Sequence, residues 1–362
     1  MRRIRMLLVV SFVVVGTLAP MTGLGAAGIA APSAGSSTAA ECSYPITETD
    51  ATGTDVTLED EPETVVTLTP SPAQTIWDIG ADEKVIGLTK HAENLEGAEE
   101  RTSVSTEAET IQPEVVVDLE PDLVLATDTS YVSEETIETL REAGLTVYYI
   151  PEATSLEEVR DRTQLIGSLV GACDGAAETV DWMDEELAVV DAAIDGEDQP
   201  DVLYTFFGYT AGSGTFVHDV IEAAGGTNVA AEAGVEGYHE LNDEVVIDSD
   251  PDWIITNTNS PEVPETPAYQ STTAVQNDQT VTININELNR PGPRTVDAVT
   301  ELADTFHPDA YAAAVDDAET SAETDESDDE SDGDELPGFG VGAVVIAALL
   351  FVMATLQRTS RS

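Results

Sequence analysis

Basic residues are scarce in this chain. Its 362 residues include 13 Lys plus Arg against 71 Asp plus Glu, and the formal net charge is -58 at pH 7. A nucleic-acid-binding surface needs clustered Lys and Arg to neutralise phosphates, so nucleic acid is excluded as a partner. Self-repulsion of this size destabilises a compact state at ordinary ionic strength, but the Debye length falls to about 3 Å in molar salt. The composition therefore indicates a halophilic source.

Cysteine is almost as scarce. The two cysteines are Cys42 and Cys173, and no His or Cys lies at metal-ligand spacing from either of them, which argues against a metal site. An even count in an exported protein favours a disulfide between them. Lipidation of Cys42 is the alternative, although Glu41 does not suit the position before a lipidated cysteine.

Catalytic motifs are also missing. Neither HExxH nor GxSxG occurs, and the four histidines are scattered at 91, 218, 239 and 307. The glycine-containing segment 208–214 lacks the Lys-Ser/Thr ending of a phosphate-binding loop. We therefore predict a protein that is not an enzyme and that needs neither a cofactor nor a metal.

The N-terminal residues 1–31 have the order of a secretory signal peptide. Arginines at positions 2, 3 and 5 precede an apolar run over 6–18, and small residues follow around 26–31. Export by the general route and export by the twin-arginine route both stay open.

The C-terminal residues 336–362 predict a membrane tether. Pro337, Gly338 and Phe339 precede an apolar stretch that ends at Leu356 and is followed by arginines. About 18 apolar residues just span a bilayer, so one interpretation is an anchor helix. The other is a sorting signal, because this order resembles the PGF-CTERM signals of archaeal surface proteins, in which a lipid replaces the helix.

Both interpretations tether the chain to the outer face of the cell membrane, and the resemblance points to a haloarchaeal source. The acidic segment 316–335 before the tether has low hydrophobicity and high charge. Such a composition predicts a disordered stalk.

One helix, corner and strand pattern occurs twice, about 130 residues apart. Residues 113–127 read PEVVVDLEPDLVLAT and residues 242–257 read NDEVVIDSDPDWIITN. In each copy a helical turn ends at an acidic-Pro-Asp corner, and a short apolar run typical of a buried parallel strand follows. The repeat predicts two similarly built α/β lobes.

Strands and helices alternate with short connections, which favours parallel sheets with right-handed crossovers. We place the lobes at 42–150 and 200–315 and the linking helical region at 151–199, with an interruption at 171–175. The predicted strands lie at 55–58, 65–68, 85–88, 123–126, 145–150, 202–207, 253–256 and 281–285, and the main helices near 75–79, 133–143, 216–224 and 294–306.

The chain resembles substrate-binding proteins of ABC importers, of the cobalamin and iron-siderophore type. The likeness lies in residues 65–71, 79–87, 121–125, 140–147, 223–228 and 289–294. It implies a two-lobed periplasmic-binding-protein fold with one long helix between the lobes and a ligand cleft between them. It also implies that a monomer delivers its ligand to a permease and its ATPase. Gln74 departs from the family, which often has Glu there.

Ligands of open α/β sheets bind beside the loops that follow the strands. Neutral polar and aromatic groups in these loops suit a large, roughly neutral ring system, so we predict cobalamin or a related corrinoid. A ferric siderophore or haem is the alternative, and an exported enzyme or a surface adhesive protein is a more distant one. The candidate ligand-binding residues are Pro70, Ser71, His91, Phe207, Tyr209, Tyr238, Asn286 and Arg290.

Glu114 and Glu244 open the two copies of the repeat. They align with two glutamates that, in cobalamin-binding members of the resembled family, meet arginines of the importer. The other interpretation is that each carboxylate only complements the dipole of its helix. The resemblance predicts that both residues dock the protein on its permease.

Overall fold

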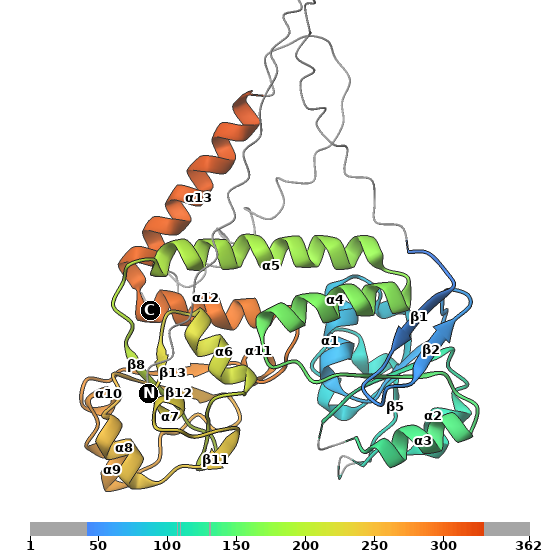
Figure 1. Cartoon of the computed structure of the whole chain (residues 1–362), viewed down its shortest axis with the longest axis horizontal. Coiled ribbons are helices and arrows are strands. Elements are labelled where there is room, and N and C mark those ends of the chain that lie inside the picture. The colour runs from blue at the N-terminus through green and yellow to red at the C-terminus, as the bar shows by residue number, and fades with distance from the viewer. Residues whose placement is uncertain (1–41, 107, 109, 130–131, 329–362) are drawn as a thin grey trace, which may run out of the picture. The chain divides into compact units, whose positions relative to one another are not determined.

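The computed structural model describes residues 42–106, 108, 110–129 and 132–328 (Figure 1). The predicted signal peptide, residues 329–335 of the predicted stalk and the C-terminal segment 336–362 with Pro337, Gly338 and Phe339 lie outside these residues. Within the described part of the chain, no helix combines the length and the apolar content that a membrane span requires.

Two parallel sheets form the framework, as predicted. The first has the strand order β5 (Thr102–Ser103), β4 (Val85–Leu88), β3 (Val65–Thr67), β6 (Leu123–Thr127) and β7 (Val147–Ile150). The second has the order β10 (Thr227–Asn228), β8 (Asp201–Tyr204), β12 (Trp253–Asn257) and β13 (Thr280–Ile283). We call the parts built on these sheets the first and the second half.

Helices and short antiparallel pairs complete both halves. The first half adds β1 (Ile46–Thr49), β2 (Asp55–Leu58), α1 (Pro70–Asp78), η1 (Asp82–Lys84), η2 (Lys90–Ala92), η3 (Ala98–Glu100), α2 (Pro113–Asp118) and α3 (Glu134–Glu142). The second adds β9 (Tyr209–Ala211), α6 (Phe216–Ala223), α7 (Val229–Glu232), β11 (Tyr238–Glu240), α8 (Asp243–Ser249), α9 (Pro267–Gln270), α10 (Thr273–Gln276), α11 (Ile285–Leu288) and α12 (Thr295–Phe306).

The sequence repeat occupies matching places in the two halves. Helix α2 leads into β6 and helix α8 into β12, and each of these strands pairs with the strand of its sheet that comes first in the sequence, β3 and β8. Glu120 (φ 48°) and Asp250 (φ 40°) end their helices in the left-handed region, directly before the prolines. Asp122 and Asp252 then accept main-chain N–H groups at 2.9 and 3.0 Å from the start of the neighbouring strand segment. The corner therefore both ends the helix and attaches the strand.

The prediction of one long linking helix is wrong. The segment forms two helices, α4 (Leu156–Val170) and α5 (Cys173–Ile194), which lie side by side in Figure 1. Gly171 at the end of α4 has φ 78°, a left-handed cap that glycine adopts without steric cost. Each helix contributes to both cores, since Ile166 of α4 packs in the first half and Val159 of α4 in the second. A helical hairpin therefore joins the halves.

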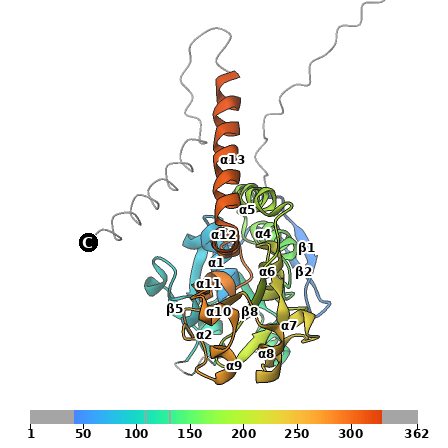
Figure 2. The same ribbon diagram turned by 90° about the vertical axis from the view of Figure 1, so that its left-hand side faces the viewer.

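The sequence predicts a disordered stalk over 316–335, and the structure describes residues 316–328 of this segment as helical. They continue helix α13 (Pro308–Asp328), which follows α12 directly (Figure 2). Proline suits a first helical position, and the alanines at 310 and 312–314 have the highest helix propensity. Tyr311 packs against the core of the second half and holds the first turn of α13 in place.

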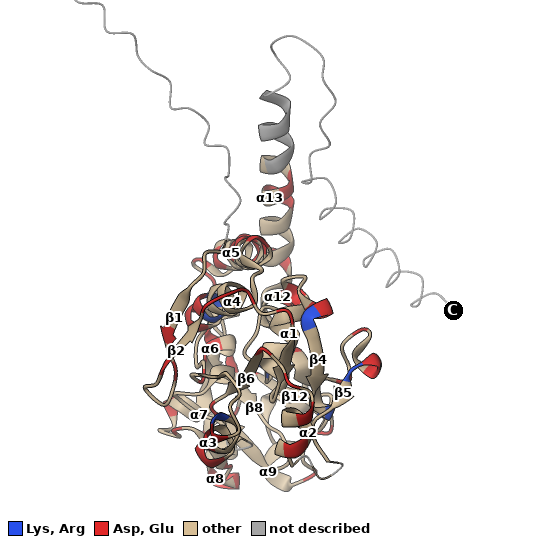
Figure 3. Ribbon diagram, turned by 90° about the vertical axis from the view of Figure 1, so that its right-hand side faces the viewer, with Lys and Arg blue, Asp and Glu red and all other residues tan. Residues whose placement is uncertain are grey.

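Acidic side chains are carried by elements of both halves, as Figure 3 shows in red. Because elements of both halves carry them, they do not distinguish one binding face.

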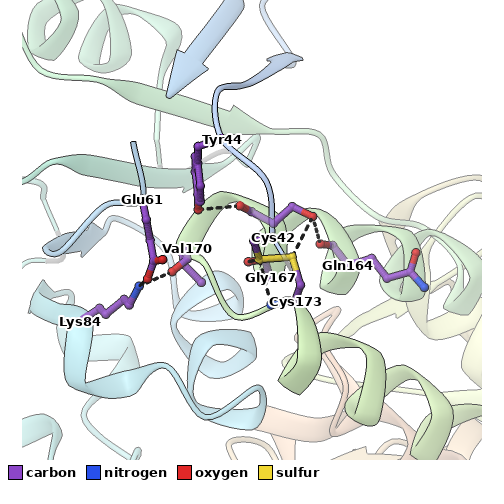
Figure 4. The surroundings of a disulfide bond; sticks show 9 residues. Cys42, Tyr44, Glu61, Lys84, Gln164, Gly167, Val170 and Cys173 are labelled. Carbon is purple, nitrogen blue, oxygen red and sulfur yellow. Dashed lines mark hydrogen bonds and ion pairs between the residues drawn. A yellow bond between two sulfur atoms is a disulfide. The ribbon is translucent and has the colours of Figure 1, made fainter. Parts of the chain in front are cut away.

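A disulfide joins Cys42 to Cys173, as predicted, with the two Cα atoms 5.4 Å apart (Figure 4). It attaches the start of the described chain to the first residue of α5. Around it, Tyr44 Oη donates to the carbonyl of Ser168 at 2.9 Å, and Lys84 Nζ donates to that of Val170 at 2.6 Å. The turn between α4 and α5 is thus fixed by three separate links.

Replacing Cys42 and Cys173 together with serine should lower the free energy of unfolding by about 3 kcal/mol, since a cross-link between residues 131 apart restricts the unfolded chain. Denaturant unfolding in molar KCl measures the change. A reductant should destabilise the wild-type protein and leave the stability of the double variant unchanged. Equal unfolding midpoints for the oxidised wild type and the double variant would show that the disulfide does not stabilise the fold.

Candidate ligand-binding site

An aromatic patch lies just beyond the end of β8. Phe206 is its centre, with ring centroids 6.2 Å from Phe207, 6.1 Å from Tyr209 and 6.1 Å from Tyr238. Tyr204 stacks beneath Phe206 at 5.5 Å with an interplanar angle of 22°. These separations are typical of interacting aromatic rings. The structure thus brings together the predicted ligand residues Phe207, Tyr209 and Tyr238. We call these three residues and Phe206 the aromatic patch.

A tight turn presents Phe207 to solvent. The predicted strand 202–207 ends at Tyr204, and the chain reverses over Phe207 and Gly208 into β9, where a loop was predicted. Phe206 and Tyr209 exchange main-chain hydrogen bonds of 3.0 and 2.8 Å across the turn. Both turn residues have positive φ, 47° and 84°, as in the two-residue turns that suit the twist of a hairpin. A phenylalanine in this conformation is strained, which is typical of functional positions.

Solvent exposure sets the patch apart from the core. The large hydrophobic side chains that are exposed in the described part of the chain are Phe207 at 69%, Tyr209 at 40%, Tyr238 at 45% and Ile247 at 55%. Three of these four belong to the patch. Exposed apolar area that is concentrated at one place marks a binding surface more often than a free surface.

The base of the patch is rigid. Asn257 Nδ2 donates to Tyr204 Oη at 2.7 Å, and Tyr204 Oη donates to Asn289 Oδ1 at 3.1 Å. Tyr204 is fully buried, and this burial raises the pKa of its phenol to about 12, although both asparagine contacts oppose the shift. The phenol therefore stays neutral and holds the ring under Phe206.

A second group of predicted residues lies where the two halves meet. Arg162 of α4 donates to Ser71 Oγ at 3.0 Å, and both side chains donate to the carbonyl oxygen of Pro291. Arg290 donates to the carbonyl of His91 at 2.6 Å and to Asn94 Oδ1 at 2.9 Å. We call these contacts the junction. Ser71, His91 and Arg290 are therefore close to partners within the protein rather than grouped with the aromatic patch.

The arginines of the junction are shielded from solvent, Arg162 almost completely and Arg290 in part. Arg162 is 6% exposed, and burial lowers the pKa of its guanidinium to about 10. Burial also lowers the pKa of Arg290 to about 10, with Arg294 as a smaller cause. Their hydrogen bonds to serine, asparagine and main-chain oxygens compensate part of the desolvation.

The remaining predicted residues have local roles. Pro70 is the half-buried first residue of α1, and the main-chain N–H of Asn286 donates to Asn284 Oδ1 at 3.1 Å in the cap of α11. Sequence reasoning missed Phe206, Tyr204 and Arg162. Of these three, only Phe206 carried a signal in the sequence, because it directly precedes the predicted ligand residue Phe207.

A cavity of about 410 Å³ lies apart from the aromatic patch, between the end of α1, α5 and the start of α12. Its charged contact is Arg294 Nε, which donates to Asp78 Oδ1 at 2.8 Å. Asp78 Oδ2 is buried without a hydrogen-bond partner. Burial is the largest cause that raises the pKa of Asp78 to about 6, and the contact with Arg294 opposes it.

The raised pKa of Asp78 predicts a specific pH dependence. A carboxyl group whose folded-state pKa lies above its unfolded value of 3.8 favours the folded state most below pH 3.8, and this contribution is lost as the pH rises to about 6. Asp78→Asn should remove that loss. Between pH 4 and 6 the free energy of unfolding of the variant should therefore rise relative to that of the wild type, by up to about 3 kcal/mol. Thermal unfolding in molar KCl measures the difference, and parallel curves across this range would contradict it.

Two α/β halves with an exposed aromatic patch beside the strand ends define a solute-binding protein. The chain belongs to the periplasmic binding protein family, to which residues 65–285 match. A cobalamin-binding protein of Halobacterium salinarum is 39% identical over 279 residues, which cover 74% of this chain and 75% of that protein. An uncharacterized ABC transporter substrate-binding lipoprotein of Bacillus subtilis is 29% identical over 287 residues, or 74% and 87% of the two chains.

Among solved structures, a periplasmic heme-binding protein from Roseiflexus in its apo form superposes with a TM-score of 0.62 at 25% identity, covering 69% of this chain and 99% of the other. The family and these relatives establish the class: the chain is a substrate-binding protein of ABC importers. The matched relatives are binding proteins and not enzymes.

Proposed function

We propose that this protein captures cobalamin or a related corrinoid on the aromatic patch and delivers it to an importer permease. The patch carries the proposal, because Phe207, Tyr209 and Tyr238 offer a wide apolar surface to a large ring system. The relative named for cobalamin binding, at 39% identity, supports the same ligand.

The charges near the patch favour a corrinoid over an anionic ligand. Haem and many ferric siderophores carry negative groups that a protein binds with free arginines. Arg162 and Arg290 already donate to protein oxygens, and Glu240 lies 3.5 Å from the hydroxyl of Tyr209. An amide-rich, nearly neutral corrinoid needs no free arginine and is not repelled by Glu240, since its amide side chains can donate hydrogen bonds to carboxylates.

Delivery requires contact with the permease, and the positions of Glu114 and Glu244 support a role of both residues in this contact. Both carboxylates are exposed in the first turn of their helices, α2 and α8, at matching positions of the repeat. One acidic residue on each half would let a two-fold permease contact both halves at once.

We further propose that the protein is exported, tethered to the outer face of the membrane through 336–362, and adapted to molar salt. The charge balance and the order of Pro337, Gly338 and Phe339 before an apolar stretch support this proposal. Mass spectrometry of the protein from its native membrane would distinguish an intact C-terminus from a cleaved and lipidated one.

The ligand is tested by titration of the purified protein in 3 M KCl while tryptophan fluorescence is followed. Cyanocobalamin should quench the fluorescence and saturate, whereas haem and a ferric siderophore should not compete. If the siderophore or haem binds and no corrinoid does, that compound is the ligand instead. If none of the three binds, the proposal is rejected.

A further inference from the structure

Ile247 is an exposed aliphatic side chain on a helix of acidic residues. It is 55% exposed on α8, and its immediate neighbours on the exposed side of the helix are Asp243, Glu244 and Asp248. A single exposed isoleucine needs no explanation by itself. Here, however, the other three large hydrophobic side chains that are exposed in the described residues form the proposed ligand site.

The position of Ile247 is specified by the repeat. Ile247 follows Glu244 by three residues, as Val117 follows Glu114, so each pair shares one face of its helix. The valine between them, at 116 and at 246, is fully buried in both halves and fixes the same orientation of α2 and α8. Val117 is only partly exposed because it packs against the core of the first half.

Both helices lie on the side of the molecule away from α5 in Figures 1 and 3. The helices that carry the two carboxylate and aliphatic pairs therefore share this side of the molecule. This arrangement suits one partner that contacts both halves together.

The salt concentration determines whether the carboxylate or the aliphatic side chain of such a pair can contribute to binding affinity. In molar salt the Debye length is about 3 Å, so exposed carboxylates attract a basic surface only weakly. Burial of an aliphatic side chain does not depend on charge and is not screened. A docking surface in molar salt therefore needs an apolar contact beside its carboxylates.

We infer that Ile247 is the apolar anchor of the docking surface, and that Val117 is its smaller counterpart on α2. The occupant is the outer surface of the importer permease, which would present an apolar pocket bordered by basic side chains. The inference rests on the proposed delivery function. It assigns the affinity of docking to Ile247 and the orientation to Glu114 and Glu244.

The test measures binding of the full chain to the permease of a corrinoid importer, purified with its ATPase in lipid nanodiscs, at 1 and 3 M KCl. Ile247→Ser should weaken binding about tenfold at both salt concentrations, as expected when a half-exposed aliphatic side chain loses its burial in an interface. Ile247→Leu, the matched control, should bind like the wild type. Glu244→Gln should have an effect that shrinks as the salt is raised.

Cyanocobalamin titration of each variant separates this inference from the proposed function. Equal permease binding by the wild type and Ile247→Ser overturns the anchor and leaves the ligand proposal intact. A wild-type protein that binds cyanocobalamin but no corrinoid permease overturns the delivery function and the anchor together. Loss of cyanocobalamin binding in Ile247→Ser would also overturn the anchor, because it would connect the residue to the ligand site.

Discussion

Replacing Tyr209 and Tyr238 together with alanine is expected to weaken cyanocobalamin binding at least 100-fold in 3 M KCl. Their rings flank Phe206 and are 40% and 45% exposed, so they are available to a ligand without unfolding or repacking the core. Truncation of a well-packed aromatic contact typically costs about 2 kcal/mol or more, and two such losses amount to at least 100-fold even when they are not additive. Isothermal titration measures the change.

The matched control keeps both rings and removes only the hydroxyl groups. Tyr209→Phe with Tyr238→Phe should bind cyanocobalamin within about threefold of the wild type, since the proposal assigns the affinity to ring contact. Thermal unfolding should be nearly unchanged in both double variants, because exposed positions contribute little to stability. Wild-type affinity in the double alanine variant would move the ligand away from the patch.

Replacing Glu114 and Glu244 together with alanine is expected to abolish uptake of cobalamin by cells while ligand affinity stays within about twofold. Both carboxylates are exposed, and neither residue belongs to the aromatic patch or the junction. Loss of both removes the groups that orient the protein on its permease, so that the apolar contact alone can no longer place the aromatic patch over the entrance. Uptake of labelled cobalamin by cells that depend on it measures the effect.

An equal change of charge elsewhere provides the control for this double variant. Glu138 on α3 and Glu232 at the end of α7 are also exposed glutamates, one on each half. Glu138→Ala with Glu232→Ala should leave uptake unchanged. Normal uptake in the Glu114 and Glu244 variant would contradict docking through these residues, and loss of cobalamin binding would connect them to the ligand site.

The framework of the fold could be predicted because its signals are local. Strand β4 has the predicted bounds, Val85–Leu88, and the repeated acidic-Pro-Asp corner gave both the α2 to β6 and the α8 to β12 units. The pairing of Cys42 with Cys173 was predicted from the even cysteine count together with the predicted export of the chain. In each case a few residues determine the local structure, and their chemistry favours one conformation or one pairing.

Features that depend on contacts between distant residues could not be predicted. Apolar periodicity continues on both sides of Gly171, so it cannot show that the chain reverses there and forms a hairpin of helices. Strand β8 ends at Tyr204, and the chain turns back into β9, which pairs with β11. The paired residues of β9 and β11 are 27 positions or more apart in the sequence. The turn at Phe207 could not be expected from the sequence either, because its φ of 47° contradicts the usual preference of phenylalanine.

The candidate site was predicted only in part, because it also depends on contacts between residues that are distant in the sequence. Loops after the strands are the expected place for a ligand, and Tyr209 and Tyr238 do lie together. Arg290 lies in such a loop as well, but its guanidinium is engaged by His91 and Asn94 of the other half. A sequence shows which side chains can donate hydrogen bonds, whereas the partner is decided by which segments the fold brings together.

A crystal structure of the protein grown with cyanocobalamin in molar salt tests the central claim most directly. The account predicts the corrin ring in van der Waals contact with Phe207, Tyr209 and Tyr238, with its amide side chains directed towards the first half. A corrin ring bound elsewhere, for example in the cavity beside Arg294, or a patch left open at saturating cyanocobalamin, would contradict it.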